Sequence, residues 1–419
     1  MIEEVERFED LLTSNFEIDD LQAVELIIAT AVSHKLKWSE MLWLRLIGAS
    51  GSGKTELLRT LSYKPYSVTM ETITAGAIRR GFVIKKNGKE QPTLLQRLNG
   101  KLVITKEFGS MLTKNADAQR EIFGLLRSVF DGELDADYGS EEGHLHQTTH
   151  FDWIIGTTPL IESNRAIEYL LGSRFIDLRW ELPSERDMAV NKAQNNDGVL
   201  NLIRAKLARA MANIIDTVVE VPKVKLDYIA PLANIAASMR SPVPRNKYNR
   251  QIEDLPSIEL GTRMGQALGR IARGLVMMGV EVSDLKPYMN RLVFNSMTNI
   301  REKVVMAMLD GLQRQAEIAA RVKLTQGAVS RVLEDMRLVG WQDSWLDTLR
   351  EDKGLIGIGR IRALLKKIEI IGEGNEEGKA IEAEMIAHIE KAYNEAEARG
   401  DTKKMAEIER WVENRSVFW

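Results

Sequence analysis

A glycine-rich stretch between a strand pattern and a helix pattern is the feature that most constrains this fold. Residues 48–55 read GASGSGKT and match the spacing G-x-x-x-x-G-K-[ST]. An apolar run at 44–47 comes directly before the stretch, and residues 56–61 after it favour a helix. In that setting the backbone N–H groups of the loop point inward at the positive N-terminal end of a helix and hold phosphate. The sequence therefore predicts a phosphate-binding loop.

Each position in this loop has an expected role. We expect Lys54 to reach the β- and γ-phosphates of a nucleotide, and the Thr55 hydroxyl to bind Mg²⁺. A Gly/Ser-rich turn that matches by chance is the alternative, and the flanking strand and helix patterns argue against it. The expected cofactors are ATP and Mg²⁺, and the expected nucleotide-binding residues of the loop are Gly48, Ala49, Ser50, Gly51, Ser52, Gly53, Lys54 and Thr55.

Length and composition narrow the class of protein. The chain has 419 residues, of which 44% are hydrophobic and 28% are charged, as in globular proteins. So long a chain exceeds one ordinary core, so we expect more than one domain. The formal net charge is −3, so a nucleic-acid surface has to be a local basic patch. The chain has no cysteine, which excludes disulfides, thiolate metal sites and cysteine nucleophiles.

Short apolar runs alternate with helical patterns between residues 41 and 183. Such alternation indicates an α/β layer with a largely parallel sheet. The expected strands are 43–48, 66–70, 101–105, 151–157 and 175–180. Together with the flanking patterns they predict five regions, which are an N-terminal helical segment (1–40), an α/β core (41–183), a helical region (184–312), a compact helical unit (313–345) and a helical tail (346–419).

The two ends of the chain have their own patterns. Met1–Glu4 is acidic and opens no signal peptide, and the apolar helix pattern at 21–32 contains Glu25 and is too short to span a bilayer. We therefore expect a soluble, cytoplasmic protein with no membrane partner. Near the C-terminus two charged helical patterns, 377–398 and 402–414, indicate a helical hairpin.

The motifs after the loop resemble those of the AAA+ ATPases in their order and spacing. A strand running into Glu107 is followed by a helix, a strand–turn–strand pattern, a strand ending at Thr157-Thr158, and Ser173-Arg174-Phe175. This order is similar to the branch with a β-hairpin before the sensor-1 strand, which includes the minichromosome maintenance (MCM) helicases, and to AAA+ ATPases of phages and mobile elements. The resemblance covers about residues 41–310 and implies an α/β P-loop NTPase fold of the AAA+ type with a helical lid.

The resemblance also implies roles for individual residues. Glu107 would polarise the attacking water or hold the magnesium shell, and Thr157 or Thr158 would orient that water. Arg174 would reach the γ-phosphate of a neighbouring subunit as an arginine finger. Arg263, in a helix similar to the sensor-2 helix, would clamp the γ-phosphate from the lid. A finger that acts between subunits implies self-association into a ring, most often a hexamer in this family.

One position departs from the family pattern. Lys106 stands where the magnesium-associated aspartate of the family usually lies, and a lysine there would repel the metal. In one interpretation the strand is offset by one residue, so that Glu107 takes the acidic role and Lys106 points elsewhere. In the other, hydrolysis is slow and the site acts as a nucleotide-dependent switch.

The expected hairpin departs from the pattern as well. Its tip, residues 138–144, is acidic, and the phosphates of DNA would repel it. A protein partner at the acidic hairpin, residues 134–150, or DNA contact by another loop fits better. His144, His146 and His150 have the spacing H-x-H-x₃-H, but because no further ligand is evident, we favour ordinary surface histidines over a zinc site.

Residues 314–341 resemble a winged-helix DNA-binding domain. Residues 315–322 form the first expected helix, Lys323-Leu324 the turn, and Thr325 the cap of the second helix, 326–337. In such domains the second helix enters the major groove. A bundle element without DNA contact is the alternative, because acidic residues dilute the basic surface. The expected DNA contacts are Arg314, Arg321, Lys323, Gln326, Ser330, Arg331 and Arg337.

Three functions are compatible with these patterns. We expect an ATP-hydrolysing AAA+ ring that acts on DNA in the replication of a phage or mobile element, as a helicase-like motor, an initiator or a loader. The second is a nucleotide-switched DNA-binding regulator, in which the ATPase lobe controls the helix-turn-helix unit but moves nothing. The third is a protein-remodelling AAA+ ATPase that grips protein with the acidic hairpin.

Overall fold

The fold is described from a computed structural model of the chain. It covers residues 1–36, 40–62, 66–80, 84–86, 89–137, 144–163, 172, 174–219, 223–246 and 248–350. The hairpin tip at 138–143, Ser173 and the helices expected at 377–398 and 402–414 lie outside these described residues. Residues 1–346 form one compact unit, to which the following account applies.

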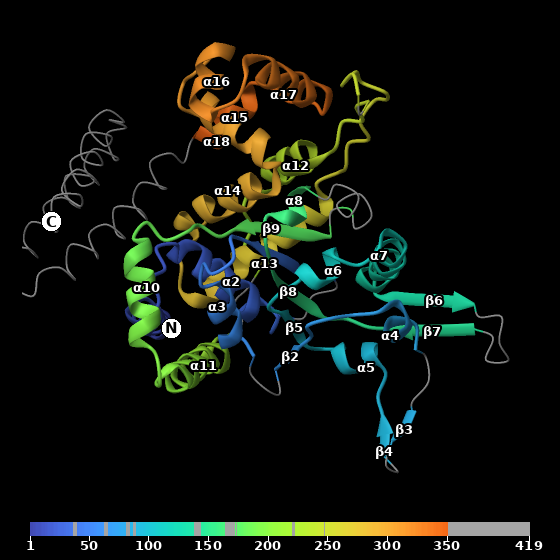
Figure 1. Ribbon diagram of the computed structural model, residues 1–419, viewed down its shortest axis with the longest axis vertical. Coiled ribbons are helices and arrows are strands. Elements are labelled where there is room, and N and C mark those ends of the chain that lie inside the picture. Colours follow the sequence, from blue (N-terminus) through green and yellow to red (C-terminus); the bar gives the residue numbers. More distant parts are fainter. Residues whose placement is uncertain are drawn as a thin grey trace, which may run out of the picture. The chain divides into compact units, whose positions relative to one another are not determined.

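A five-stranded sheet with all strands parallel lies at the centre of this unit (Figure 1). The strand order is β2-β5-β8-β1-β9, so β1 lies between β8 and β9. The five strands expected from the sequence are confirmed, and the α/β class with them. Their bounds are β1 (Trp43–Ile47), β2 (Ser67–Thr69), β5 (Leu102–Thr105), β8 (Asp152–Thr157) and β9 (Phe175–Arg179).

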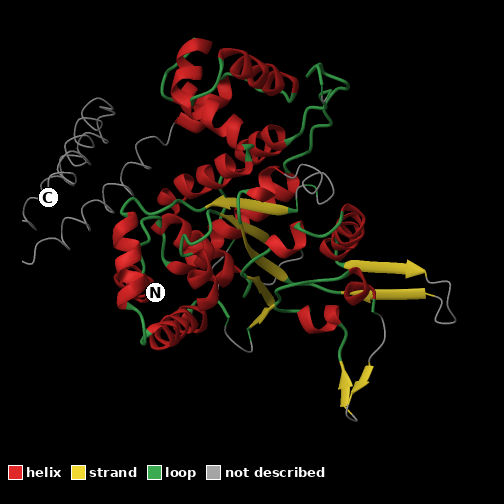
Figure 2. Cartoon of the chain, viewed as in Figure 1, coloured by secondary structure: helices red, strands yellow, loops and turns green. Residues whose placement is uncertain are grey.

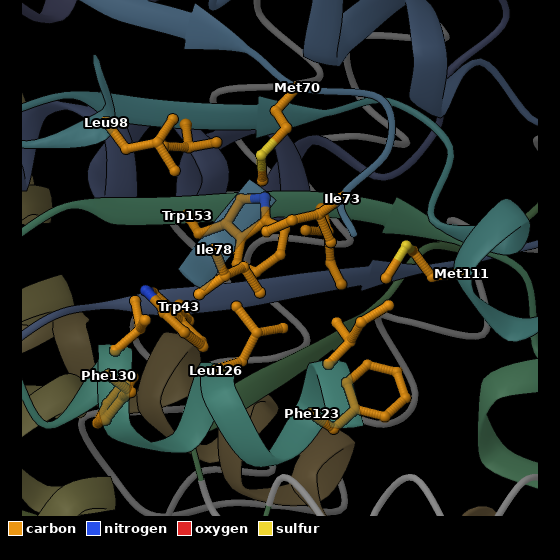
Figure 3. Packing of buried hydrophobic residues seen from close by; sticks show 14 of the residues in the cluster. Trp43, Met70, Ile73, Ile78, Leu98, Met111, Phe123, Leu126, Phe130 and Trp153 are labelled. Atoms are coloured by element: carbon orange, nitrogen blue, oxygen red, sulfur yellow. The ribbon is translucent and has the colours of Figure 1, made fainter. Parts of the chain in front are cut away.

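The central strands are buried along their whole length and mostly apolar, because both of their faces are covered. Trp43 of β1 and Trp153 of β8 are register partners, and their rings meet edge to face at a centroid distance of 5.2 Å. Figure 3 shows side chains from the sheet and from α7 (Ala116–Phe130), among them Phe123 and Phe130, interleaving around these rings. Burial of such large rings is a main stabilising contribution to the unit.

Short helices connect the strands. Asn115 caps α7, because its side chain accepts a hydrogen bond from the N–H of Ala118. The helix after β1 begins at Lys54, within the glycine-rich loop. The remaining helices of this layer are α3 (Lys54–Thr60), α4 (Ala75–Arg79), α5 (Leu94–Leu98), α6 (Gly109–Leu112) and α8 (Leu160–Ser163).

Two β-hairpins extend from the sheet layer (Figure 2). The expected hairpin is β6 (Glu133–Asp137) paired with β7 (His144–Thr148). The second, β3 (Ile84–Lys86) paired with β4 (Lys89–Gln91), was not expected from the sequence. Its strands are three residues long and rich in lysine, so they lack the apolar alternation by which a strand is recognised.

Helices before and after the sheet layer complete the unit. Asp20 caps α2 (Leu21–Ser33), since its Oδ1 accepts from the N–H of Ala23 at 3.2 Å. A Cβ at Gly274 would lie 2.2 Å from the carbonyl oxygen of Ala29, so α13 packs on α2 more closely than a side chain would allow. The other helices are α1 (Ile2–Asn15), α10 (Arg186–Asn195), α11 (Leu200–Thr217), α12 (Ile229–Arg240), α13 (Thr262–Met278), η1 (Val282–Asp284), α14 (Leu285–Ser296) and α15 (Asn299–Leu309).

The helix-turn-helix pattern is confirmed in α16 (Gln315–Val322) and α17 (Gln326–Leu338). Lys323 has a left-handed backbone with φ 57°, and Thr325 caps α17 by accepting from the N–H of Ala328. The wing expected with this pattern is not seen between residues 313 and 350, which are described throughout. A further helix, α18 (Ser344–Arg350), follows instead. Across the described part of the chain, no helix combines the length and apolar character needed to cross a membrane.

Candidate functional site

The glycine-rich loop lies at the carboxyl end of β1 and runs into α3. Gly51 and Gly53 have φ of 77° and 85°, a left-handed backbone that only glycine adopts readily. A Cβ at Gly48 would lie 2.9 Å from the Cβ of Trp180. The glycines thus permit both the curvature of the loop and its close approach to the strand beside it. In open α/β sheets, ligands bind outside the carboxyl ends of the strands, where this loop lies.

Lys54 lies inside the curve of the loop. Its Nζ donates to the carbonyl oxygens of Gly48 at 2.8 Å and Ala49 at 2.6 Å, and to the Ser52 hydroxyl at 3.2 Å. Burial lowers the pKa of Lys54, and the carboxylate of Glu107 partly offsets that effect. The hydrogen-bond acceptors of this buried cation are all uncharged, so a bound phosphate would supply the charge that the loop itself does not.

Two residues hold the loop from outside, and the sequence patterns did not point to either. Trp180, directly after β9, donates from Nε1 to the carbonyl oxygen of Ser52 at 2.7 Å. Ile18, in the segment between α1 and α2, comes within 3.6 Å of a Cβ built on Gly53. Both are remote from the loop in sequence, so only the folded chain brings them there.

Thr157 has a buried hydroxyl beside the loop. It is the last residue of β8 and the register partner of Ile47, and its carbonyl oxygen accepts from the N–H of Gly48 at 3.1 Å. Its Oγ1 is buried and has no hydrogen-bond partner among the described residues. Such a group is costly unless a ligand or water satisfies it. Thr158 is only half-buried, so Thr157 is the better candidate for contact with a bound water.

Lys106 and Glu107 follow β5 but differ in their surroundings. Nζ of Lys106 lies 2.6 Å from Oε1 of Glu71, which follows the edge strand β2. The exposed Glu107 accepts from the N–H of Gly109 at 3.0 Å and acts electrostatically on Lys54. The acid therefore lies on the side of the loop, and the lysine is directed to the sheet edge. These contacts favour the offset-strand interpretation.

Arg174 and Arg263 lie near the amino ends of the strands, whereas the loop lies at their carboxyl ends. Arg174 precedes Phe175, the register partner of Trp43 at the start of β1, whereas the loop follows the end of β1. Both arginines contact one carboxylate, Asp131, with N–O distances of 2.7 Å for Arg174 and 3.8 Å for Arg263. The five residues of β1 span about 15 Å, which is beyond the length of either side chain. Neither arginine is therefore brought to the loop of its own chain.

The three histidines of the hairpin do not form one cluster, since two of them share a carboxylate and the third lies apart. Oδ1 of Asp135 lies 2.7 Å from Nδ1 of His146 and 3.7 Å from Nε2 of His144. This hydrogen bond raises the pKa of His146. His150 lies beyond the end of β7, and the described residues include no group of three or more His, Asp or Glu side chains suited to a metal.

The expected DNA-contacting side chains of the helix-turn-helix unit are all exposed. The acidic residues Glu334 and Asp335 on α17 are ion-paired with Arg245, at 2.6 Å and 2.7 Å respectively. Arg245 belongs to the Pro-containing basic loop between α12 and α13, and its side chain is only 14% exposed.

Comparison of the chain with models of known protein families gives no match, and a search of curated proteins finds no similar sequence. The function of the site has to be judged from its geometry.

Proposed function

We propose that this chain binds ATP with Mg²⁺ at residues 48–55 and hydrolyses it as an ATPase of the AAA+ type. The observation that carries the proposal is Lys54, a buried cation held only by uncharged acceptors inside a loop that follows a central parallel strand. A triphosphate fits these donors, since the loop amides, the ammonium and the start of α3 are all positive. Mg²⁺ would be held by Thr55 and Glu107, and it would neutralise charge on the phosphates.

The residues around the loop then have distinct tasks. Glu107, whose carboxylate acts electrostatically on Lys54 at the loop, orients the attacking water and accepts its proton. The Thr157 hydroxyl, buried and without a partner, hydrogen-bonds that water and holds it in line. Trp180 and Ile18 keep the loop in shape.

Completion of the site requires a second copy of the chain in this proposal. Arg174 and Arg263 are at the far edge of the sheet and face away from their own loop, so they serve the γ-phosphate bound by a neighbour. In such a contact the side of one copy that carries Arg174 and Arg263 meets the side of the next copy that carries the loop. This contact is head-to-tail, and head-to-tail contacts close into a ring when the rotation between copies permits. A hexamer is the ring size we propose, from the resemblance to AAA+ ATPases.

DNA is the proposed partner of the helix-turn-helix unit, in a replication role as a helicase-like motor, initiator or loader. Its support is the exposed polar and basic surface of α16 and α17, combined with neutralisation of Glu334 and Asp335 by Arg245. The decisive experiment measures ATP turnover with and without single- and double-stranded DNA, for wild type, Lys54→Ala, Glu107→Gln and Arg174→Ala. DNA-stimulated turnover that each substitution removes supports the proposal. Equal ATP binding by wild type and Lys54→Ala would refute it.

A nucleotide-switched DNA-binding regulator is the second candidate, and Arg245 favours it. Through this residue the loop that leads into α13, the helix of Arg263, is ion-paired directly to α17. If ATP alters duplex-DNA affinity with negligible turnover, and Arg245→Ala removes that effect, the regulator is the better description.

A further inference from the structure

Asp131 occupies an unusual position, and the inference from it rests on the proposed function above. It follows α7 directly as the C-cap residue, where the negative end of the helix dipole disfavours a carboxylate. It is also half-exposed, so burial does not demand a charged partner. Two arginines from distant parts of the chain nevertheless converge on it.

The two arginines that contact Asp131 repel one another. Arg127, one turn earlier on α7, is exposed, and it acts electrostatically on Arg174 together with Arg263. Burial lowers the pKa of Arg174, Asp131 raises it, and the two other arginines lower it again. Asp131 is thus an anion that holds Arg174 and Arg263 against their mutual repulsion, a task that a more highly charged anion could perform as well.

Arg174 is withdrawn from the surface in this arrangement. Its side chain is 5% exposed, whereas that of Arg263 is 43% exposed. The guanidinium lies over the ring of Phe130 at 5.6 Å from the centroid and bonds Asp131 at 2.7 Å. A neighbouring copy could use Arg174 only after the guanidinium exchanges Asp131 for another anion.

We infer that Asp131 is an intramolecular counter-ion that holds Arg174 and Arg263 in reserve, and that the γ-phosphate of ATP bound by a neighbouring copy displaces it. The phosphate carries more charge and more acceptor oxygens than the carboxylate, so it competes effectively once a neighbour brings it close. Asp131 acts through the arginines, and it is a positioning residue for the proposed reaction.

The position of Asp131 links this exchange to the β6–β7 hairpin. Gly132, the next residue, has φ 94° and leads into β6, and its carbonyl oxygen accepts from the N–H of Thr149 after β7. Phe130, under the guanidinium, precedes Asp131. Release of Arg174 therefore removes two contacts from the residues at the base of the hairpin. The nucleotide state of one copy would then reach the hairpin of the next.

Removal of the charge at Asp131 tests the inference in the full-length chain. Asp131→Asn is expected to lower the ATP concentration for half-maximal turnover by about fivefold, because the arginines no longer have a competing carboxylate. Asp131→Glu, which keeps the charge, should behave as wild type. Asp117→Asn, which removes an exposed carboxylate at the other end of α7, is the matched control. The double variant Asp131→Asn/Arg174→Ala should not show the lower ATP concentration for half-maximal turnover.

Hydrogen exchange of residues 133–137 and 144–148 gives a second readout. In wild type a non-hydrolysable ATP analogue should speed exchange at the hairpin base, and Asp131→Asn should show fast exchange without nucleotide. If turnover depends on Arg174 but Asp131→Asn matches Asp117→Asn in both measurements, the inference alone fails. A higher ATP concentration for half-maximal turnover in Asp131→Asn would also overturn it, because Asp131 would then help Arg174 to act. Absence of Lys54-dependent ATP binding in wild type would instead defeat the proposed function, and this inference with it.

Discussion

Lys106 and Glu71 form an ion pair of 2.6 Å at the carboxyl edge of the sheet, between the ends of the neighbouring strands β5 and β2. The strand order puts β2 on the side of β5 away from β1. The ammonium of Lys106 is thereby directed away from the glycine-rich loop, while Glu107, the next residue, acts on Lys54 in that loop. Two adjacent residues, Lys106 and Glu107, are therefore directed to different places, the lysine to the edge of the sheet and the acid to the loop.

Substitution of these two neighbours should therefore have opposite consequences. Glu107→Gln should abolish turnover and preserve ATP binding, because it removes the base but not the phosphate contacts. Lys106→Ala should leave turnover within about threefold of wild type and cost no more than about 1 kcal/mol of unfolding free energy, as for other solvent-accessible pairs. Steady-state turnover and thermal unfolding measure both. Loss of turnover in Lys106→Ala would assign that lysine a part in the reaction.

Lys106→Asp separates the two interpretations of this strand. If the natural site is slowed by the lysine, an aspartate should speed turnover. If the strand is offset, the new carboxylate meets Glu71 and repels it, so turnover should not rise. Turnover of Lys106→Asp beside Lys106→Ala distinguishes charge repulsion from loss of the lysine.

Lys54→Ala should weaken ATP binding by about 10- to 100-fold, because charge-assisted hydrogen bonds to phosphate contribute about 1.5–3 kcal/mol. Arg59→Ala removes an exposed cation from the same helix and serves as the control. Calorimetric titration of ATP with Mg²⁺ measures the dissociation constants. Equal affinities of the two variants would contradict phosphate binding by this loop.

Thr157→Val is expected to separate stability from activity. The Thr157 hydroxyl is buried without a hydrogen-bond partner, so an isosteric valine should leave the unfolding free energy unchanged or raise it by about 1 kcal/mol. Turnover should fall by at least about tenfold, since the water loses its orienting group.

Thr105→Val provides the contrast for this prediction. The Thr105 hydroxyl donates to the carbonyl oxygen of Met70 at 2.5 Å and accepts from Nε1 of Trp153 at 2.9 Å. Valine there should destabilise the fold by about 1–3 kcal/mol in denaturant unfolding. Equal stability of the two variants would show that the Thr157 hydroxyl has a partner within the protein.

Asp152 at the start of β8 connects three parts of the unit, since its carboxylate accepts from His34, Arg270 and the N–H of Leu42. Asp152→Asn leaves the buried Arg270 guanidinium without its carboxylate and should cost about 3–5 kcal/mol of unfolding free energy. Gln266→Ala, on the exposed side of α13, should cost little.

The pH dependence of that loss follows from the pKa of Asp152. Burial acts to raise this pKa, but His34 and Arg270 outweigh it, so the pKa lies below its usual value. A lowered folded-state pKa gives stability that is complete above the unfolded value of about 3.9 and is lost as the pH falls through the folded-state pKa. The stability difference between wild type and Asp152→Asn should persist from pH 7 to pH 5 and narrow below about pH 4. A difference that shrinks between pH 7 and pH 5 would contradict this assignment.

Two arginines of the helix-turn-helix unit should affect DNA binding differently. Arg331 is exposed on α17 and is proposed to read bases, so Arg331→Ala should reduce discrimination between DNA sequences by about 1–3 kcal/mol. Arg321 is exposed on α16 and is proposed to contact phosphate, so Arg321→Ala should weaken all sequences alike and lower the salt slope by about 1. Salt-dependent titrations with specific and random duplexes measure both. If neither change affects DNA binding, the proposed DNA contacts of α16 and α17 are wrong.

Sequence patterns were sufficient to predict those features of the fold that depend on residues close together in the chain. The five strands were predictable because buried parallel strands are mostly apolar runs, and the position of the glycine-rich loop because its glycines and Lys54 lie within eight residues. The caps Asp20 and Thr325 were predictable for the same reason, since each accepts from an N–H three residues on. The wing expected after α17 was wrong for the residues described up to 350, because helix-turn-helix units with and without a wing share the same two helices.

Tertiary structure decided which side chains meet across the chain. The partner of Lys106 had to come from another strand end, and the partner of Arg174 from the end of α7. The short hairpin β3–β4 and the hydrogen bond from Trp180 to the loop likewise have no local pattern. The sequence pattern around a charged residue does not identify its ion-pair partner. An ion pair between distant residues forms only when the packed core fixes the positions of both backbones. The sequence alone therefore predicted a glycine-rich loop on a parallel sheet, and the packing of that sheet determined which acid lies on the side of the loop and which acid holds the two arginines at the other end of the strands.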